Sequence, residues 1–238
     1  MLRGKEELNT ITWFRSNRIS HYYFINREDG NLDMIDTSAP IERKKIDLFL
    51  SLKKKSLKRL LLTHGHPDHA GNADYLRKKY KCSVHAHEFE VPYLRGEKVL
   101  KKRDYTGINP FGRIIQFGDW LFKEPQCQEV VPLQECDNYN YVPLHGHTPG
   151  SVGILHKKTK SLFLGDALIN CTAVYMIPRP GLLTPYHYFS EDHEAALKCL
   201  KNLQHVDFDN AFFGHGNPII GNAKEKVLSF LKENNLLD

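Results

Sequence analysis

The sequence predicts an α/β fold, a layered sandwich in which helices lie outside two β-sheets. Short strand-like runs come first, stretches with helical spacing interleave with them, and this order occurs twice along the chain. The 238 residues are 41% hydrophobic and 26% charged, which supplies a sizeable core and excludes a disordered chain, a collagen-like chain or a coiled coil. Without an internal repeat or a Ser/Gly/Pro-rich linker, we expect a single domain over residues 1–238.

The first half of the chain opens with short β-leaning runs separated by turn residues. A helix is expected after Pro40, because side chains recur there every three to four residues, at Ile41, Lys45, Leu48 and Leu52. The other expected elements of this half are strands at 10–15, 21–26, 32–36, 57–63 and 83–87 and a helix at 68–80.

The second half begins with residues 91–119, a Gly- and charge-rich stretch that we interpret as an insertion or a lid over the site. Regular patterns then return. The expected elements are strands at 141–144, 152–156, 161–164 and 211–213 and helices at 191–202 and 222–234.

Charge and cysteine content bear on the partners and the cellular location of the protein. The formal net charge is +5, but the basic runs at 53–55 and 101–103 have no interleaved aromatics, so they favour a solvated surface over a nucleic-acid partner. No apolar run is long enough for a signal peptide or a membrane span, so no membrane association is expected. Five cysteines without a C-x-x-C pair are typical of reduced thiols and a cytoplasmic location.

One segment carries a concentrated chemical signal, an H-x-H-x-D-H string that directly follows an expected strand. In an extended chain, residues two apart point to the same side, so His64 and His66 can converge on one metal ion. Pro67 disfavours helix before it. Asp68 and His69 then begin a helix and can reach a second metal position, and we expect Asp68 to be the N-cap.

Three further polar residues, His147, Asp166 and His215, each follow a predicted strand and have glycine beside them. Glycine lets the backbone turn tightly and approach closely. Imidazoles and carboxylates without thiolates favour Zn²⁺, with Mn²⁺ or Fe²⁺ as alternatives.

With these motifs the sequence resembles the metallo-β-lactamase-fold hydrolase superfamily, in its glyoxalase II and lactonase-like branch. The resemblance extends from the His64 string to Gly214–His215–Gly216 in motif order and spacing. It implies a four-layer αββα sandwich with a dinuclear metal centre, most simply two zinc ions, at the edge between the sheets. By resemblance, one metal would be held by His64, His66 and His147, the other by Asp68, His69 and His215, and Asp166 would bridge both.

The resemblance also implies a mechanism in which a hydroxide shared by the two metals attacks a carbonyl or phosphoryl centre. Asp68 would orient this nucleophile and carry a proton to the leaving group. Outside the metal shell, His145 is expected either to support a ligand or to lie on the surface. His187 is expected in a pocket wall, and Cys171 as a buried, inert thiol.

Departures from known subfamilies limit the substrate. β-Lactamases with a His-rich second site lack the bridging Asp166, and their periplasmic signal peptide is not seen. Glyoxalase II-like thioesterases usually have His where Ser151 stands, and a longer C-terminal extension. Lactonases place Tyr three residues after the bridging Asp, where this chain has Ile169 followed by Asn170. Another tyrosine could take that role, and the candidates are Tyr175, Tyr186 and Tyr188.

The stretch 177–185 resembles the general bacterial hydrolases of this fold. We therefore expect hydrolysis of an ester, thioester or lactone of a small metabolite, by a chain whose size is compatible with a homodimer. Two alternatives stay open: a phosphodiesterase or ribonuclease of the same fold, slightly favoured by the basic runs, and a non-catalytic metal-binding sensor.

Overall fold

The computed structural model describes residues 5–14, 20–100, 125–136, 138–174 and 177–237. Its strands form a seven-stranded sheet, a four-stranded sheet and a separate hairpin. The first sheet runs in chain order through β1 (Lys5–Leu8), β2 (Ile11–Phe14), β3 (Tyr22–Asn26), β4 (Leu32–Ile35), β5 (Leu57–Leu61), β6 (Ser83–Ala86) and β7 (Val130–Pro132). The second has the order β13 (Asn210–Phe212), β10 (Ser161–Phe163), β9 (Val152–His156) and β8 (Tyr139–Pro143), and the hairpin pairs β11 (Ile169–Val174) with β12 (Ile177–Leu183).

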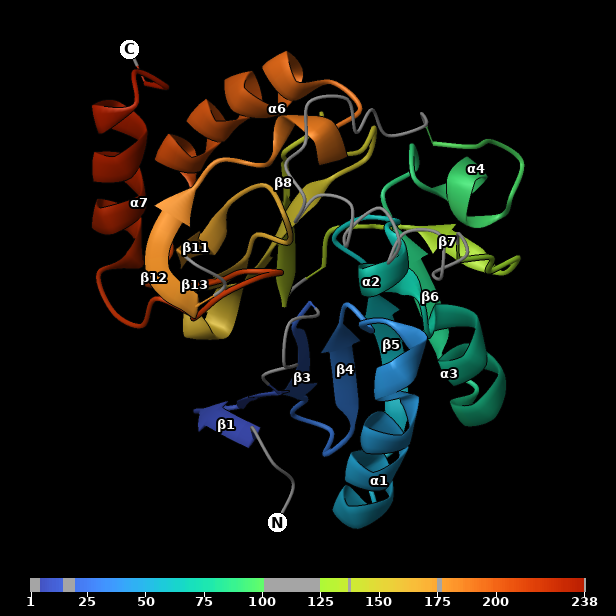
Figure 1. The fold of residues 1–238 in the computed structure, drawn as a ribbon. Helices are drawn as coiled ribbons and strands as arrows, with labels where there is room; N and C mark the ends of the chain where they lie inside the picture. The colour runs from blue at the N-terminus through green and yellow to red at the C-terminus, as the bar shows by residue number, and fades with distance from the viewer. Residues whose placement is uncertain (1–4, 15–19, 101–124, 137, 175–176, 238) are drawn as a thin grey trace.

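Helices cover the outer face of each large sheet, as the sequence predicts. Strands β4 to β7 pair in parallel, so their connections must cross over the sheet. These crossovers contain a 3₁₀ turn η1 (Pro40–Glu42), α1 (Arg43–Lys53), α2 (Pro67–Ala70), α3 (Ala73–Tyr80) and α4 (Val91–Leu94). The second sheet is covered by α6 (His193–Cys199), its 3₁₀ continuation η4 (Leu200–His205) and α7 (Ala223–Glu233). Figure 1 shows the two helical layers on opposite sides of the paired sheets, which confirms the αββα sandwich.

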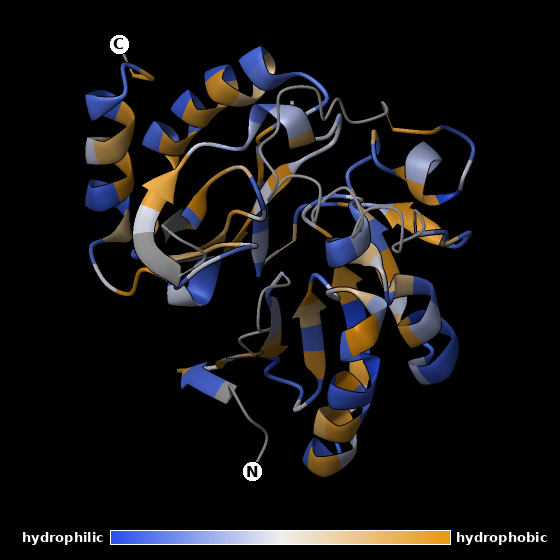
Figure 2. Cartoon of the chain, viewed as in Figure 1, coloured by the Kyte–Doolittle hydropathy of each residue, from blue (hydrophilic) through white to orange (hydrophobic). Residues whose placement is uncertain are grey.

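Three apolar clusters hold the layers together. One packs the first sheet against α1 and α3, and a second packs the other sheet against η4 and α7. Figure 2 shows α7 hydrophobic toward the sheet and hydrophilic on its outer side. The third cluster lies between the sheets, where Phe163 stacks on Phe212 at 4.9 Å and the Tyr23 hydroxyl donates to the Phe213 carbonyl. Apolar burial at three interfaces is what a four-layer fold requires.

Helix α1 confirms the helix predicted after Pro40, but the residues whose spacing predicted it lie largely on its exposed side. Leu48 is 49% exposed and Leu52 is 64% exposed. The buried side instead carries Phe49, which packs against Phe14 and Phe24 with ring centroids 5.1 and 4.4 Å apart.

The helix predicted at 68–80 is two helices, because the chain breaks at Gly71 and Asn72. The buried Asn72 amide donates to the carbonyls of Thr37 and Ala39, both at 2.8 Å, and so ties this break to the loop after β4. The Asn72 side chain therefore satisfies loop carbonyls in place of a continued helix.

Most other predicted elements appear within one or two residues of their expected bounds, but β1, β7, β11 and β12 were not predicted. The helix predicted at 191–202 ends in the 3₁₀ turn η4. Of the predicted insertion at 91–119, α4 and residues up to 100 are described, and 101–119 lie outside the described residues. Within the described ranges, none of the helices combines the length and apolar character needed to cross a bilayer.

Candidate metal centre

The first half of the site is built where β4 and β5 end side by side. Because the strands are parallel, their carboxyl ends meet at one edge, and Asp36 lies there next to Thr63. The Asp36 carboxylate accepts hydrogen bonds from the Thr63 amide at 2.8 Å and from the Thr63 hydroxyl at 2.7 Å. The same hydroxyl lies 3.1 Å from Nδ1 of His64. This network fixes the start of the segment that carries His64 and His66.

The second half of the site comes from the other sheet. His147 follows β8, while Asp166 and His215 follow the parallel strands β10 and β13. The Gly214 amide donates to the Gly165 carbonyl at 2.7 Å, so the turns after β10 and β13 lie against each other. A Cβ on Gly214 would lie 2.1 Å from Oδ1 of Asp166, so only glycine permits this approach.

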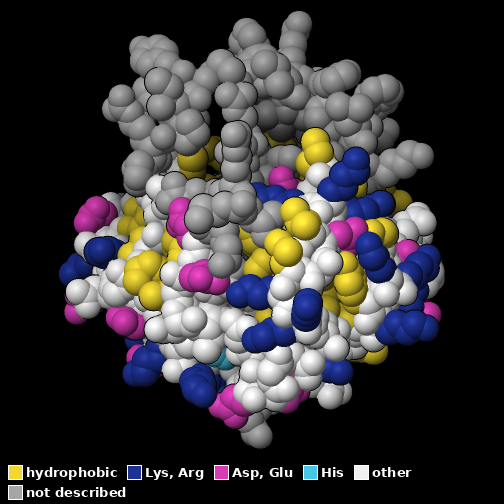
Figure 3. All heavy atoms as spheres, turned by 90° about the horizontal axis from the view of Figure 1, so that it is seen from below, with side chains coloured by type: hydrophobic (Ala, Val, Ile, Leu, Met, Phe, Trp, Pro, Cys, Tyr) yellow, Lys and Arg dark blue, Asp and Glu magenta, His cyan; other side chains and the backbone are white. Residues whose placement is uncertain are grey.

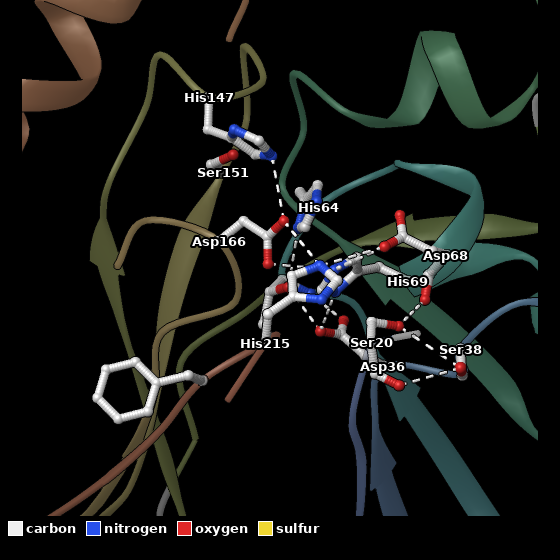
Figure 4. Close-up of polar contacts among 12 residues, drawn as sticks. Ser20, Asp36, Ser38, His64, Asp68, His69, His147, Ser151, Asp166 and His215 are labelled. Atoms are coloured by element: carbon white, nitrogen blue, oxygen red, sulfur yellow. Dashed lines mark hydrogen bonds and ion pairs between the residues drawn. The ribbon is translucent and has the colours of Figure 1, made fainter. Parts of the chain in front are cut away.

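All seven predicted residues meet at this edge of the sandwich. Figure 4 labels all of them except His66. The ligand atoms form overlapping groups within 4.8 Å: His64, His66 and His147; His64, His69 and Asp166; and Asp68, His69 and His215. The first and third groups are the two sets that the family resemblance implies.

Asp166 lies between the two groups. Its Oδ1 is 3.2 Å from Nε2 of His69, and its Oδ2 is 3.3 Å from Nε2 of His215 and 3.6 Å from Nε2 of His147. Oδ2 of Asp68 lies 3.2 Å from the same nitrogen of His215. Asp166 thus contacts histidines of both metal-binding groups, whereas Asp68 contacts only the group that contains His215.

Burial and neighbouring opposite charges shift the pKa values of the site residues in opposite directions. Burial, together with the neighbouring imidazoles, holds the pKa of His64 well below its usual range. Burial also opposes the charged forms of His215 and Asp166, but their mutual attraction prevails, so the pKa of His215 rises to about 10 and that of Asp166 falls well below its usual range. The pKa of Asp68 is lowered in the same way by His69 and His215, against the effect of its burial.

These residues fit a divalent metal. Nε2 of the fully buried His64 has no hydrogen-bond partner among the described residues, and such an atom costs about 1–3 kcal/mol when left unsatisfied. Its lowered pKa keeps this imidazole neutral, which is the form that binds metal. Nitrogen and carboxylate donors without thiolate suit zinc, manganese or iron.

Sequence reasoning missed Asp36, whose Oδ2 lies 2.9 Å from Nδ1 of His69. Its signal was the same as that of the other carboxylates, a polar residue at the end of an expected strand, but it has no glycine beside it. A hydrogen bond to the distal nitrogen of a metal-binding histidine fixes the tautomer and orientation of the ring.

We predict that Asp36→Asn weakens metal binding about 10- to 100-fold, because the amide cannot serve Thr63 and His69 as the carboxylate does. Chelator competition on the purified variant measures this change. Asp47→Asn is the matched control, since Asp47 accepts hydrogen bonds from Tyr75 and Tyr80 away from the site. Equal metal affinity in the two variants would contradict the role of Asp36.

The predicted N-cap role of Asp68 is wrong. His66 occupies the N-cap position of α2 and Pro67 is the first helical residue, which suits proline because that position needs no amide hydrogen. Asp68 therefore lies in the first turn, with its side chain directed to His215.

His145, His187 and Cys171 lie outside the candidate metal groups. The ring of His145 packs against His87 at 4.8 Å and Phe89 at 5.9 Å, and no hydrogen bond joins it to a predicted ligand in the described structure. His187 is exposed, on a 3₁₀ turn η3 (His187–Phe189). Cys171 is half-buried where a buried thiol was expected, and this partial burial raises the pKa of the thiol.

An αββα sandwich with histidines and aspartates gathered at the edge between its sheets is the architecture of a known class of metallo-hydrolases. The chain belongs to the metallo-beta-lactamase superfamily, whose family model matches residues 15–215.

Known proteins of this superfamily are similar over much of the chain. The probable metallo-hydrolase YflN of Bacillus subtilis (strain 168) is 28% identical over 227 residues, covering 86% of this chain and 83% of that protein. The hydroxyacylglutathione hydrolase GloC of Haemophilus influenzae is 29% identical over 148 residues, or 59% of this chain and 63% of its own. The chain is accordingly a metallo-hydrolase of this superfamily with a candidate metal site.

Solved structures share the fold. TTHA1623 in a di-iron-bound form has a TM-score of 0.63 at 20% identity and covers 87% of this chain and 92% of its own. The DIM-1 metallo-beta-lactamase has a TM-score of 0.65 at 16% identity and covers 97% of each chain.

Proposed function

We propose that this protein is a dinuclear metal-dependent hydrolase that cleaves an ester, thioester or lactone of a small metabolite. One observation carries the proposal: two three-residue groups of metal-binding atoms adjoin at one edge of the sandwich, with Asp166 in contact with both. A closed structural site would favour cysteine ligands, and none of the residues gathered here is a cysteine.

In this proposal His64, His66 and His147 hold one ion, Asp68, His69 and His215 hold the other, and Asp166 binds both. Two divalent ions bound here would lower the pKa of a water between them and polarise the carbonyl oxygen under attack. Zinc is the first choice for this donor set, with manganese or iron as alternatives.

The exposure of the two carboxylates suggests different roles. The side chain of Asp68 is 31% exposed, whereas that of Asp166 is 10% exposed. Asp68 is therefore the carboxylate that solvent and substrate can reach, and we assign to it the orientation of the nucleophile and proton transfer to the leaving group. Asp166, held between buried imidazoles, serves as the central ligand.

A polar contact joins His147 to an aromatic turn. Nδ1 of His147 lies 3.4 Å from the Ser190 hydroxyl, which donates to the Tyr186 carbonyl at 2.9 Å. Tyr186 stacks on Tyr188 at 5.4 Å, so an aromatic turn adjoins this ligand. Asn170, next to the position of the lactonase tyrosine, uses its amide to hold Asn217 and Gly181.

The relatives favour a thioester among these substrates, since GloC is named for the hydrolysis of hydroxyacylglutathione.

The phosphodiester alternative has less support from the surface charges. On the face seen in Figure 3, Lys and Arg side chains are interspersed with Asp and Glu. In the basic run at 53–55, Lys53 pairs with Glu7 at 3.7 Å and Lys55 donates to Asn26 at 2.7 Å, while 101–103 lie outside the described residues. Five free cysteines fit the proposed cytoplasmic location.

The test is metal content per chain combined with a panel of thioester, lactone, ester and phosphodiester substrates. We expect about two ions per chain and turnover of one carboxylic ester class. Turnover should fall at least about 100-fold on chelation and return when metal is restored. Turnover of phosphodiesters alone, weakened steeply by salt, would establish the nucleic-acid alternative. Less than one ion per chain with no turnover after metal addition would favour the sensor.

A further inference from the structure

Glu90 is a fully buried carboxylate between the two loops that carry the three-histidine group. Its Oε1 accepts a hydrogen bond from the Gly150 amide at 2.7 Å. Its Oε2 faces Gly65, where an added Cβ would lie 2.6 Å away, and a Cβ on Gly150 would lie 2.8 Å from the Glu90 Cγ. Gly65 stands between His64 and His66, and Gly150 follows His147 by three residues. The side chain therefore fills the space between the two loops.

Burial of this carboxylate is costly, because no Lys or Arg forms an ion pair with it in the described structure. By contrast, the buried carboxylate of Asp33 pairs with Arg59 at 2.6 Å and with Arg27 at 3.1 Å. Packing between the loops could have been achieved by an apolar side chain of similar volume without this cost. The position of this carboxylate next to the loops that carry His64, His66 and His147 offers an explanation, since a cation bound by those histidines would compensate its charge.

We propose that Glu90 is a positioning residue for the metal ion held by His64, His66 and His147. Its carboxylate accepts from Gly150 in the 147–150 loop and packs against Gly65 in the 64–66 loop, so that imidazoles from two different sheets converge on one point. This inference rests on the proposed function, because it requires that the three-histidine group binds metal.

The test compares Glu90→Gln with Asp33→Asn, two replacements of a buried carboxylate by an amide of the same shape. Glutamine keeps the shape of the side chain but is neutral, and its NH₂ group either faces Gly65 or replaces the oxygen that accepts from the Gly150 amide. We expect Glu90→Gln to weaken one of the two bound ions about 10- to 100-fold, in zinc titrations against a chelator. The absorption of the cobalt-substituted three-histidine site should change, and kcat should fall more than KM rises. Asp33→Asn should lower Tm and leave both affinities unchanged.

Two outcomes separate this inference from the proposed function. If wild-type protein binds two ions and Glu90→Gln binds both with unchanged affinity and spectrum, Glu90 has only a packing role and the inference is wrong. If wild-type protein binds no metal, the proposed function fails and the inference fails with it.

Gly65→Ala is a second test of the role of Glu90, for use if Glu90→Gln does not fold. Its methyl group would press on Oε2 of Glu90, so we expect the same selective loss of one ion. Gly153→Ala is the control, because a Cβ there meets side-chain atoms of Leu144 and Leu162 at 3.1 and 3.3 Å. Full metal affinity in Gly65→Ala would overturn the inference.

Discussion

Replacement of Asp166 by alanine is expected to reduce kcat/KM about 1000-fold, equivalent to about 4 kcal/mol of transition-state stabilisation, while the protein stays folded. Asp166 contacts His69 and His147, which belong to different groups, so its loss removes the ligand common to both proposed ions. We therefore expect the metal content to fall along with the activity. The measurements are turnover of the substrate found in the panel, metal per chain, and the far-ultraviolet circular dichroism spectrum.

Asp209→Ala is a suitable control for this variant. Asp209 accepts a hydrogen bond from the Asn222 amide and precedes β13, at the end of the strand opposite His215. We expect it to keep its metal and activity with a modest loss of stability. An Asp166→Ala protein with near wild-type turnover would show that the two-metal assignment is wrong.

Replacement of Asp68 is also expected to have a large effect on turnover, but with a different effect on metal binding. Asp68→Ala should lower kcat by about 10²–10⁴-fold, the usual contribution of a general acid or base. Asp68→Asn keeps the shape and one oxygen beside His215 but cannot carry a proton. We therefore expect Asp68→Asn to retain more metal than Asp166→Ala and still to be nearly inactive, with KM little changed.

Comparison of metal content and kcat in Asp68→Asn and Asp166→Ala separates proton transfer from ligation. Should Asp68→Asn lose metal and activity in the same proportion, Asp68 is a ligand only. Should it turn over substrate at the wild-type rate, neither role is correct.

The convergence of the seven candidate residues could be predicted because their signals are local. His64 and His66 lie two apart on extended chain, and His147 and Asp166 each follow an apolar strand at a glycine. The ends of strands in a layered fold meet at one edge, so these patterns were sufficient to place the site. The pairing of the residues into two groups depended on the family resemblance.

Other features could not be read from the sequence, for physical reasons. β7 has only three residues, and β12 contains Pro178 and Pro180, which argue against a strand because proline cannot donate to a ladder. The exposed side of α1 has as good a helical period as its buried side, and only the packing of Phe49 on the sheet distinguishes them. The contact of Glu90 with Gly150 joins residues 60 apart and has no sequence pattern.

The distribution of the candidate ligands over two sheets also has a mechanical consequence. His64 and His66 follow a strand of one sheet, while His147 and Asp166 follow strands of the other. Bound as proposed, the ions would cross-link the two sheets and oppose their separation during unfolding. At a free metal concentration 100 times Kd, one such ion would add about 2.7 kcal/mol to the free energy of unfolding. Metal supply would then govern the lifetime of the protein against proteases as well as its activity.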